Sequence, residues 1–164
     1  MKRIFFCLLS CLLLLGCDPA VKMAGEYSYK LSGKVTIDDS EYTLSNEQGT
    51  IDLLRKTDGD MLLTFSQLRG GLYTAEAEIN DTLLTLYPFA RTVGVTFIVP
   101  DTTFLLGDTI VRDKEVSETF DAEVTGTGTL YKETIVFDLY FNGESQSSDA
   151  HLTGENILMV AKKN

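Results

Sequence analysis

The stretch that decides the fold runs from residue 25 to residue 37 and reads GEYSYKLSGKVTI. Its large apolar residues all stand at odd positions, and polar residues fill the even positions between them. A period of two over a dozen residues is typical of a β-strand with one buried face and one solvated face. The odd positions in question are Tyr27, Tyr29, Leu31, Val35 and Ile37.

The same alternation recurs along the rest of the chain, separated by short polar turns. Asp58-Gly59, Asn80-Asp81 and the run 131–134 have the composition of tight turns between antiparallel strands. No segment shows the apolar spacing of a long helix. We therefore predict one all-β domain, an antiparallel up-and-down barrel of about eight strands, with a β-sandwich as the alternative. The predicted strands lie near residues 51–53, 61–65, 73–79, 83–87, 120–130, 135–141, 150–153 and 157–161.

The stretch from Pro100 to Glu115 fits this pattern least well. We interpret it as a long connection. Within it, residues 104–106 either cover a barrel mouth or form a short strand.

The first residues have the character of an export signal. Lys2 and Arg3 precede an apolar run of about 18 Å as a helix, which is too short for a bilayer core of about 30 Å. The run ends in Leu14-Leu15-Gly16-Cys17, which resembles the lipobox of bacterial lipoproteins, although Leu15 is larger than the residue usual before the glycine. This resemblance implies a signal peptide over 1–16, a lipid on Cys17, a tether over 17–24 and a barrel domain over 25–164. It also implies a cell-envelope location on the outer membrane, at its periplasmic or surface face.

Charge and cysteine content narrow the partners further. Cys7 and Cys11 would leave with the signal, so the mature chain would have neither a free thiol nor an internal disulfide. Loss of Lys2 and Arg3 would take the formal charge from −10 to −12. So acidic a chain is repelled by nucleic acid and by anionic lipid headgroups, and the expected membrane partner is the bilayer reached through the lipid on Cys17.

Gly25-Glu26-Tyr27 resembles the start of the first strand in calycins, the lipocalin-like barrels, which carry a glycine, any residue and a tryptophan there. The alternation over residues 24–86, and Gly126-Thr127-Gly128-Thr129-Leu130 leading into residues 135–137, are similar to calycin-like lipoproteins of gut Gram-negative anaerobes. Tyrosine replaces the tryptophan, and Lys162 is the expected substitute for the arginine that true lipocalins place over that ring. The resemblance implies the barrel more strongly than it implies any activity.

The chain offers few groups for catalysis, metal binding or cofactor binding. His151 is the single histidine, and we interpret it as a solvated surface residue. Asp58-Gly59-Asp60 lacks the further oxygen ligands of a calcium loop. Glu76 and Glu78 share the wet face of a strand. We therefore predict neither an enzyme nor a cofactor.

The aromatic residues at buried positions are the main functional lead. Eight strands enclose just enough room to be filled by side chains or to hold one small ligand. We expect a small apolar or amphipathic ligand inside the barrel; the alternative is a non-enzymatic accessory subunit of an envelope complex with a filled barrel. The candidate ligand-binding residues are Tyr27, Tyr29, Phe65, Tyr73 and Phe120.

The acidic exterior should favour a neutral or cationic ligand over an anionic one. Compensation for an anion could come only from a nearby lysine or from one of four arginines. These are Arg55, Arg69, Arg91 and Arg112.

Three matches to aspartate, then serine or threonine, then a small apolar residue or threonine resemble the O-glycosylation sites of exported proteins in the same bacterial group. Thr82, Thr102 and Thr109 are the acceptors that this resemblance implies. A glycan must be reached by its transferase, so we expect Thr82 and Thr102 in exposed turns.

Replacement of the lipobox cysteine tests the anchor. Cys17→Ser should abolish fatty-acid labelling and leave a soluble or uncleaved precursor, because no other thiol stands at a cleavage site of this kind. Metabolic labelling and membrane flotation of the variant measure this. Continued labelling together with continued flotation would show that Cys17 is not the lipidated residue.

Overall fold

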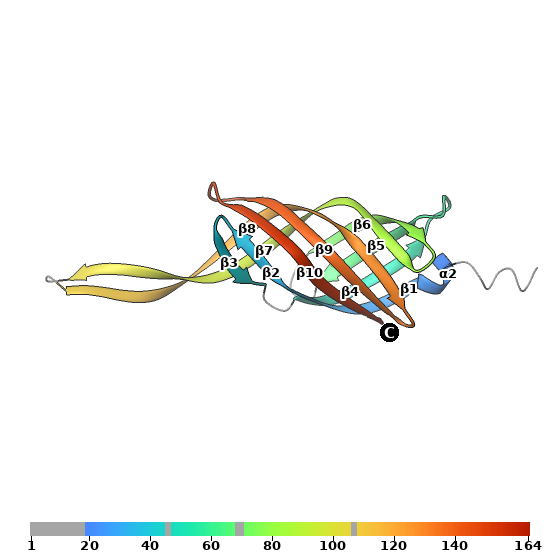
Figure 1. The fold of residues 1–164 in the computed structure, drawn as a ribbon, viewed down its shortest axis with the longest axis horizontal. Coiled ribbons are helices and arrows are strands. Elements are labelled where there is room, and N and C mark those ends of the chain that lie inside the picture. Colours follow the sequence, from blue (N-terminus) through green and yellow to red (C-terminus); the bar gives the residue numbers. More distant parts are fainter. Residues whose placement is uncertain (1–18, 45–46, 68–70, 106–107) are drawn as a thin grey trace, which may run out of the picture.

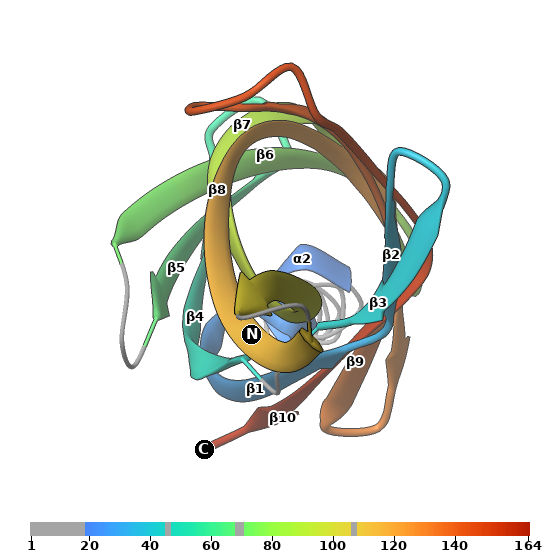
Figure 2. The same ribbon diagram turned by 90° about the vertical axis from the view of Figure 1, so that its left-hand side faces the viewer.

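The computed structural model describes residues 19–44, 47–67, 71–105 and 108–164, and it describes residues 100–111 by their backbone alone. A single antiparallel sheet curls until β1 pairs with both β4 and β10 (Figures 1 and 2). Eight strands thus form a closed barrel, as predicted, and the β2–β3 hairpin extends the sheet beside β10. The strands are β1 Gly25–Ser32, β2 Lys34–Ile37, β3 Ser40–Thr43, β4 Glu47–Arg55, β5 Met61–Gln67, β6 Leu72–Asn80, β7 Leu83–Leu105, β8 Asp108–Tyr131, β9 Thr134–Ser145 and β10 His151–Lys163.

The alternation read in the sequence determines which side chains fill the barrel. Tyr27, Tyr29 and Leu31 of β1 point inward and are at most 2% exposed. Phe65, Phe120 and other members of the predicted dry faces join them in one continuous core. The core comes from all eight barrel strands, so its packing holds the barrel closed.

Two glycines let aromatic rings lie close against the barrel wall. Tyr29 stands opposite Gly49 in the β1–β4 ladder, and a Cβ on Gly49 would lie 2.8 Å from the Tyr29 ring. Phe137 stands opposite Gly128, where a Cβ would lie 2.6 Å from its ring. Glycine permits the sharp coiling of a small barrel, and the facing ring covers the backbone it exposes.

A short helix, α2 (Pro19–Met23), closes one end of the barrel (Figure 2). Ala20 and Met23 are buried, and Tyr27 Oη donates a hydrogen bond to the Met23 carbonyl at 2.9 Å. Part of the predicted 17–24 tether is therefore packed against the barrel. No helix in the described part of the chain is long and apolar enough to cross a membrane.

Lys163 joins the last strand to this helix. Its Nζ donates to the carbonyls of Lys22 (3.1 Å) and Ala24 (2.8 Å) and lies 5.7 Å from the centre of the Tyr27 ring. The prediction that Lys162 takes this position was wrong, because the inward positions of β10 from Ile157 onward are odd and Lys162 points outward. Gly25, at φ 133°, permits the approach, since a Cβ there would lie 3.0 Å from Lys163 Cε.

The strands β7 and β8 continue past the barrel as a two-stranded ribbon (Figure 1). The ladder between β6 and β7 ends at Ala77 and Leu86, whereas β7 and β8 remain paired from Leu83 to Leu105. The predicted connection over residues 100–115 was therefore wrong. Strands joined by one hairpin pair with each other and need no barrel neighbour. The Tyr42 ring of β3 packs at 4.7 Å on Phe97 and supports the base of the ribbon.

The last strand is one element where two short strands were predicted. Its pairing with β9 is irregular between Gly154 and Ile157, and Asn156 adopts φ 57°. This bulge keeps the strand continuous while it changes partner, from β2 to β1.

The core position of Phe137 gives a direct test of the register. Phe137→Ala should lower the free energy of unfolding by about 3–5 kcal/mol, because it removes a fully buried ring and uncovers Gly128. Asp138→Ala, one position along and on the outer face, should stay within about 0.5 kcal/mol of wild type. Denaturant melts of both variants measure the difference, and equal losses would contradict the register.

Candidate functional site

An arginine lies inside the barrel, near the end opposite α2. Arg91 projects inward from β7, and its side chain is 3% exposed. Its Nη2 pairs with Glu47 Oε2 at 2.5 Å, and Glu47 is the first residue of β4. Glu47 shares the inward parity of Gly49 and Ile51, so strand alternation alone directs this carboxylate into the interior.

Two tyrosines complete the polar cluster. Tyr29 Oη donates to Glu47 Oε1 at 2.8 Å, and Arg91 Nη1 donates to Tyr73 Oη at 3.2 Å. The four side chains come from β1, β4, β6 and β7, so the barrel closure brings them together. We call Tyr29, Glu47, Tyr73 and Arg91 the interior cluster.

Burial and charge shift the acidity of these groups. Burial raises the pKa of Tyr29 well above its ordinary value, and Tyr73 and Glu47 raise it further. Burial also raises the pKa of Tyr73, to about 12, against an opposing effect of Arg91. Burial on its own lowers the pKa of Arg91, but Tyr73 and Glu47 outweigh it and the pKa stands above its ordinary value. Both phenols therefore stay neutral and Arg91 stays charged at physiological pH.

Aromatic rings surround the guanidinium. Phe65, Tyr73 and Phe89 stack nearly parallel, with ring centres 4.6 to 6.0 Å apart. Arg91 Cζ lies 4.9 Å from the centre of the Tyr73 ring and 5.5 Å from that of Phe141. Such rings present flat apolar surface and also stabilise the cation.

One donor of the cluster has no acceptor. Arg91 Nε is buried and makes no hydrogen bond to any described residue. Buried donors are nearly always paired, so an orphaned N–H beside a flat aromatic surface suggests an acceptor supplied from outside the chain. Tyr73 and Phe89, whose rings stack, lie on β6 and β7 beyond the end of the ladder between these two strands, so the cluster sits beside a break in the strand pairing.

The structure brings together three of the five predicted ligand-binding residues. Tyr29 and Tyr73 belong to the interior cluster, and Phe65 stacks on Tyr73. Tyr27 lies at the α2 end instead, and Phe120 is buried in the core without a ring contact to the described aromatic residues. The sequence alone could not show that Tyr27 and Phe120 lie apart from the other three residues.

Sequence reasoning missed Glu47 and named Arg91 only among four arginines. The signal was present, since both are charged residues at positions with the parity of a buried face. Glu47 precedes Gly49, Ile51 and Leu53 by even steps, and Arg91 precedes Val93 and Val95 in the same way.

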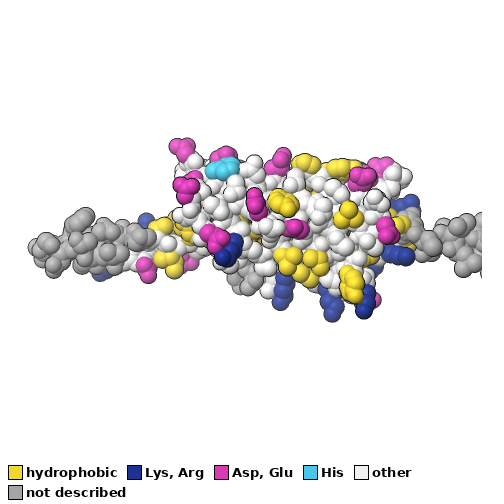
Figure 3. Space-filling view, viewed as in Figure 1, with side chains coloured by type: hydrophobic (Ala, Val, Ile, Leu, Met, Phe, Trp, Pro, Cys, Tyr) yellow, Lys and Arg dark blue, Asp and Glu magenta, His cyan; other side chains and the backbone are white. Residues whose placement is uncertain are grey.

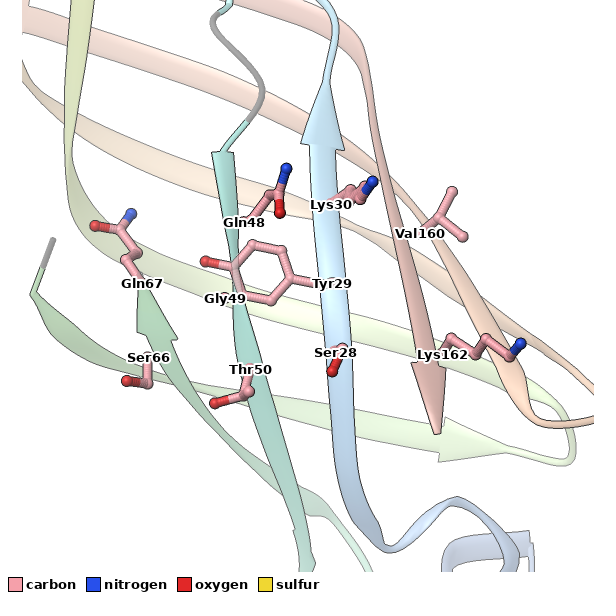
Figure 4. Close-up of a pocket in the computed structure, with 10 residues that line it drawn as sticks. All are labelled: Ser28, Tyr29, Lys30, Gln48, Gly49, Thr50, Ser66, Gln67, Val160 and Lys162. Carbon is pink, nitrogen blue, oxygen red and sulfur yellow. The ribbon is translucent and has the colours of Figure 1, made fainter. Parts of the chain in front are cut away.

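A hollow of about 740 Å³ lies across β10, β1, β4 and β5. Ser28, Thr50 and Ser66 lie side by side on neighbouring strands, and the Tyr29 ring lies across β4 at Gly49 (Figure 4). Lys30 and Lys162 flank this row and make no ion pair or hydrogen bond with a described residue. The hollow thus has a largely apolar lining, which includes Val160, with two lysines at its border.

The polar groups that the sequence analysis set aside lie on the surface. His151 Nδ1 lies 2.8 Å from Glu144 Oε1, and both side chains are exposed. Asp58 and Glu76 each pair with Lys56, which fits a turn and a wet strand face. No three metal-binding side chains gather anywhere in the described residues.

The predicted modification sites fall in different places. Thr82 is exposed in the turn between β6 and β7. Thr102 and Thr109 lie in β7 and β8, so the expected turn at Thr102 is absent. Cys17 lies outside the described residues.

Together, the fold and the cluster define a small antiparallel β-barrel with a charged, aromatic-lined interior. The chain matches no family model and no curated protein sequence. Among solved structures it is similar to a redesigned β-barrel, at 12% identity and a TM-score of 0.38, over 90% of this chain and 96% of that one. At that TM-score, the barrel assignment rests on the strand pairing of this chain.

The raised pKa of Tyr73 predicts a dependence of stability on alkaline pH. The folded state holds the phenolic proton more tightly than the unfolded state, whose pKa is near 10.0, so the contribution of Tyr73 is complete below pH 10. It is lost as the pH rises from 10.0 through about 12. In urea melts the decline of unfolding free energy over this range should be smaller for Tyr73→Phe than for wild type. Parallel declines would contradict the buried, hydrogen-bonded phenol.

Proposed function

We propose that the barrel binds a small amphipathic molecule at the interior cluster, without catalysis, and that the ligand carries a neutral hydrogen-bond acceptor. The observation that carries this proposal is the buried Arg91 Nε with no acceptor in the described chain. An acceptor on the ligand would satisfy that donor. The apolar part of the same ligand would contact Phe89 and the rings stacked with it.

The preference for a neutral head follows from charge. Glu47 already neutralises Arg91, so the interior cluster has no net charge to offset the acidic exterior. A carboxylate would have to compete with Glu47 for the guanidinium. A cationic amine would meet Arg91 itself and offers no acceptor. A neutral head that carries an acceptor is therefore favoured. The composition alone had predicted either a neutral or a cationic ligand.

The chain as a whole fits a lipid-anchored, calycin-like carrier in the cell envelope. This part of the proposal rests on the lipobox at Cys17 and on the Gly25-Glu26-Tyr27 motif. The contact of Lys163 with the Tyr27 ring supports it, because a cation of the last strand over that ring is the arrangement the resemblance implies. The implied location is the outer membrane.

Thermal melts with three ten-carbon ligands test the binding proposal. Decanamide, decanoate and decylamine share one tail, and the amide should stabilise the wild-type chain most. A ligand at a hundredfold excess over its dissociation constant stabilises by about 2.7 kcal/mol. Glu47→Gln should shift the preference to decanoate, because it leaves the Arg91 charge uncompensated inside the barrel.

Glu41→Gln is the matched control for that change. It removes one negative charge from the exposed Lys34–Glu41 pair, outside the barrel. The ligand preference of this control should equal that of wild type. A shift to decanoate in both variants would mean that overall charge, and not the interior cluster, selects the ligand.

A second candidate function is that of an accessory subunit, and the ribbon favours it. Residues 92–100 of β7 read TVGVTFIVP and carry no charge, although beyond Leu86 this strand pairs with β8 alone. Charged residues normally guard such edges against pairing. If none of the three ligands shifts the melt of any variant, ligand binding is contradicted and the accessory role is favoured.

A further inference from the structure

We infer that the outer face of β9, β10 and β1 is a membrane-contacting surface that fits an anionic lipid leaflet, so that the barrel lies on its side. This inference rests on the proposed lipid anchoring at Cys17. We call the surface the lateral face. Its residues are Lys30, Tyr131, Lys132, Val136, Leu158, Val160 and Lys162.

The lateral face has an apolar centre. Val136 stands opposite Val160 in the β9–β10 ladder, and Leu158 lies two positions along on the same side of β10. Their exposed fractions are 38%, 39% and 43%. Tyr131 is 71% exposed at the end of β8, with Lys132 Nζ 5.6 Å from its ring centre. A phenol ring beside a lysine suits the interface between headgroups and acyl chains.

Lysines border this centre on the side of β1 and at the β8–β9 turn. Lys30 stands opposite Val160, and Lys162 stands opposite Ser28 and Thr134. Lys30, Lys132 and Lys162 are exposed and make no ion pair with a described residue. Asp138 stands opposite Leu158 within the ladder. Glu26 and Glu133 lie at its border, where their backbone carbonyls accept hydrogen bonds from Asn164 and Lys163.

The three lysines of this region equal the three carboxylates in number, so the local charge is balanced, whereas the chain as a whole is strongly negative. Figure 3 shows basic and apolar side chains together on the lower part of the barrel, whereas acidic side chains lie mostly on the upper part. Charges further away than about 10 Å are largely screened at physiological ionic strength. The lateral face can thus approach anionic headgroups although the formal charge of the chain is −10.

The chain path brings this face to the bilayer. Pro19 follows Cys17 by two positions in the sequence, which limits the distance between their Cα atoms to about 7 Å. The helix that follows is held beside the end of β10, since Lys163 donates to the Lys22 carbonyl. A lipid on Cys17 would consequently place the end of the lateral face at the headgroups. One acyl anchor gains stability from a second, electrostatic contact.

Fluorescent labels on the lipidated chain test the orientation. The mature chain has no free thiol once Cys17 carries lipid, so Val160→Cys and Thr85→Cys each give one labelling site. Thr85 is exposed on β7, across the barrel from β10. In phosphatidylglycerol-containing vesicles with a headgroup quencher, the label at position 160 should be quenched several-fold more than the label at position 85.

Charge reversal separates electrostatic contact from anchoring. The double variant Lys30→Glu/Lys162→Glu should lose the difference between the two labels, since each lysine near such a surface contributes about fivefold to binding. Lys34→Glu/Lys114→Glu carries the same change in charge away from the lateral face and should keep the difference. For the wild-type chain, the difference in quenching between the two labels should be smaller on vesicles of pure phosphatidylcholine, which carry no net charge.

The outcomes distinguish this inference from the anchor on which it rests. A chain that floats with vesicles but shows equal quenching at both labels overturns the lateral face alone. The lateral face is also overturned, and the anchor is not, if the two double variants show the same difference in quenching between the labels. A chain that fails to float overturns the lipid anchor and the lateral face together.

Discussion

The pairing of β1 with β10 closes the barrel, and the other features depend on its register. Tyr29 lies opposite Ala161 and Tyr27 opposite Lys163, so the aromatic residues of β1 face the core while Lys30 and Lys162 face outward. A slip of one residue would exchange the two faces of β1 relative to its neighbour. The same closure carries Glu47 on β4 and Arg91 on β7 into one interior, although 44 residues separate them in sequence.

An ion pair between a buried arginine and a partly exposed glutamate is an unusual component for so small a core. Removing two charges from water costs several kcal/mol per ion, and well-packed apolar residues of similar volume are often at least as stable. Here the pair is held by two phenols and covered by rings, yet Arg91 Nε is left without an acceptor in the described chain. That combination suits binding better than stability. The α2 end differs, because there Tyr27 Oη and Lys163 Nζ donate to backbone carbonyls of α2 and of the residue after it, and so help to close the barrel.

Strand alternation was enough to predict the barrel, most of its strands and much of its core, since each depends on a local period of two. The ribbon was not predictable in this way, because Pro100 and Asp101 are residues typical of loops. In addition, the two strands of the ribbon pair only with each other, outside the barrel. The five residues of α2 are too few for a helical period. Tyr29, Phe65 and Tyr73 were predicted as a site from their parity. Their grouping with Glu47 and Arg91 depends on the order of strands around the barrel, which no local pattern contains.

The central claim is that the interior cluster exists for binding and not for stability. The unfolding free energy of the double variant Arg91→Met/Glu47→Leu tests it most directly, because the replacements keep the volume and remove both charges. Urea melts should show a stability within about 1 kcal/mol of wild type, or above it, while Glu47→Leu alone costs about 3–5 kcal/mol by leaving the buried Arg91 charge unpaired. Arg91→Met alone should cost less, because the Glu47 side chain is 23% exposed to water. A double variant as unstable as the single variants would contradict the claim and make the ion pair a structural element of the barrel.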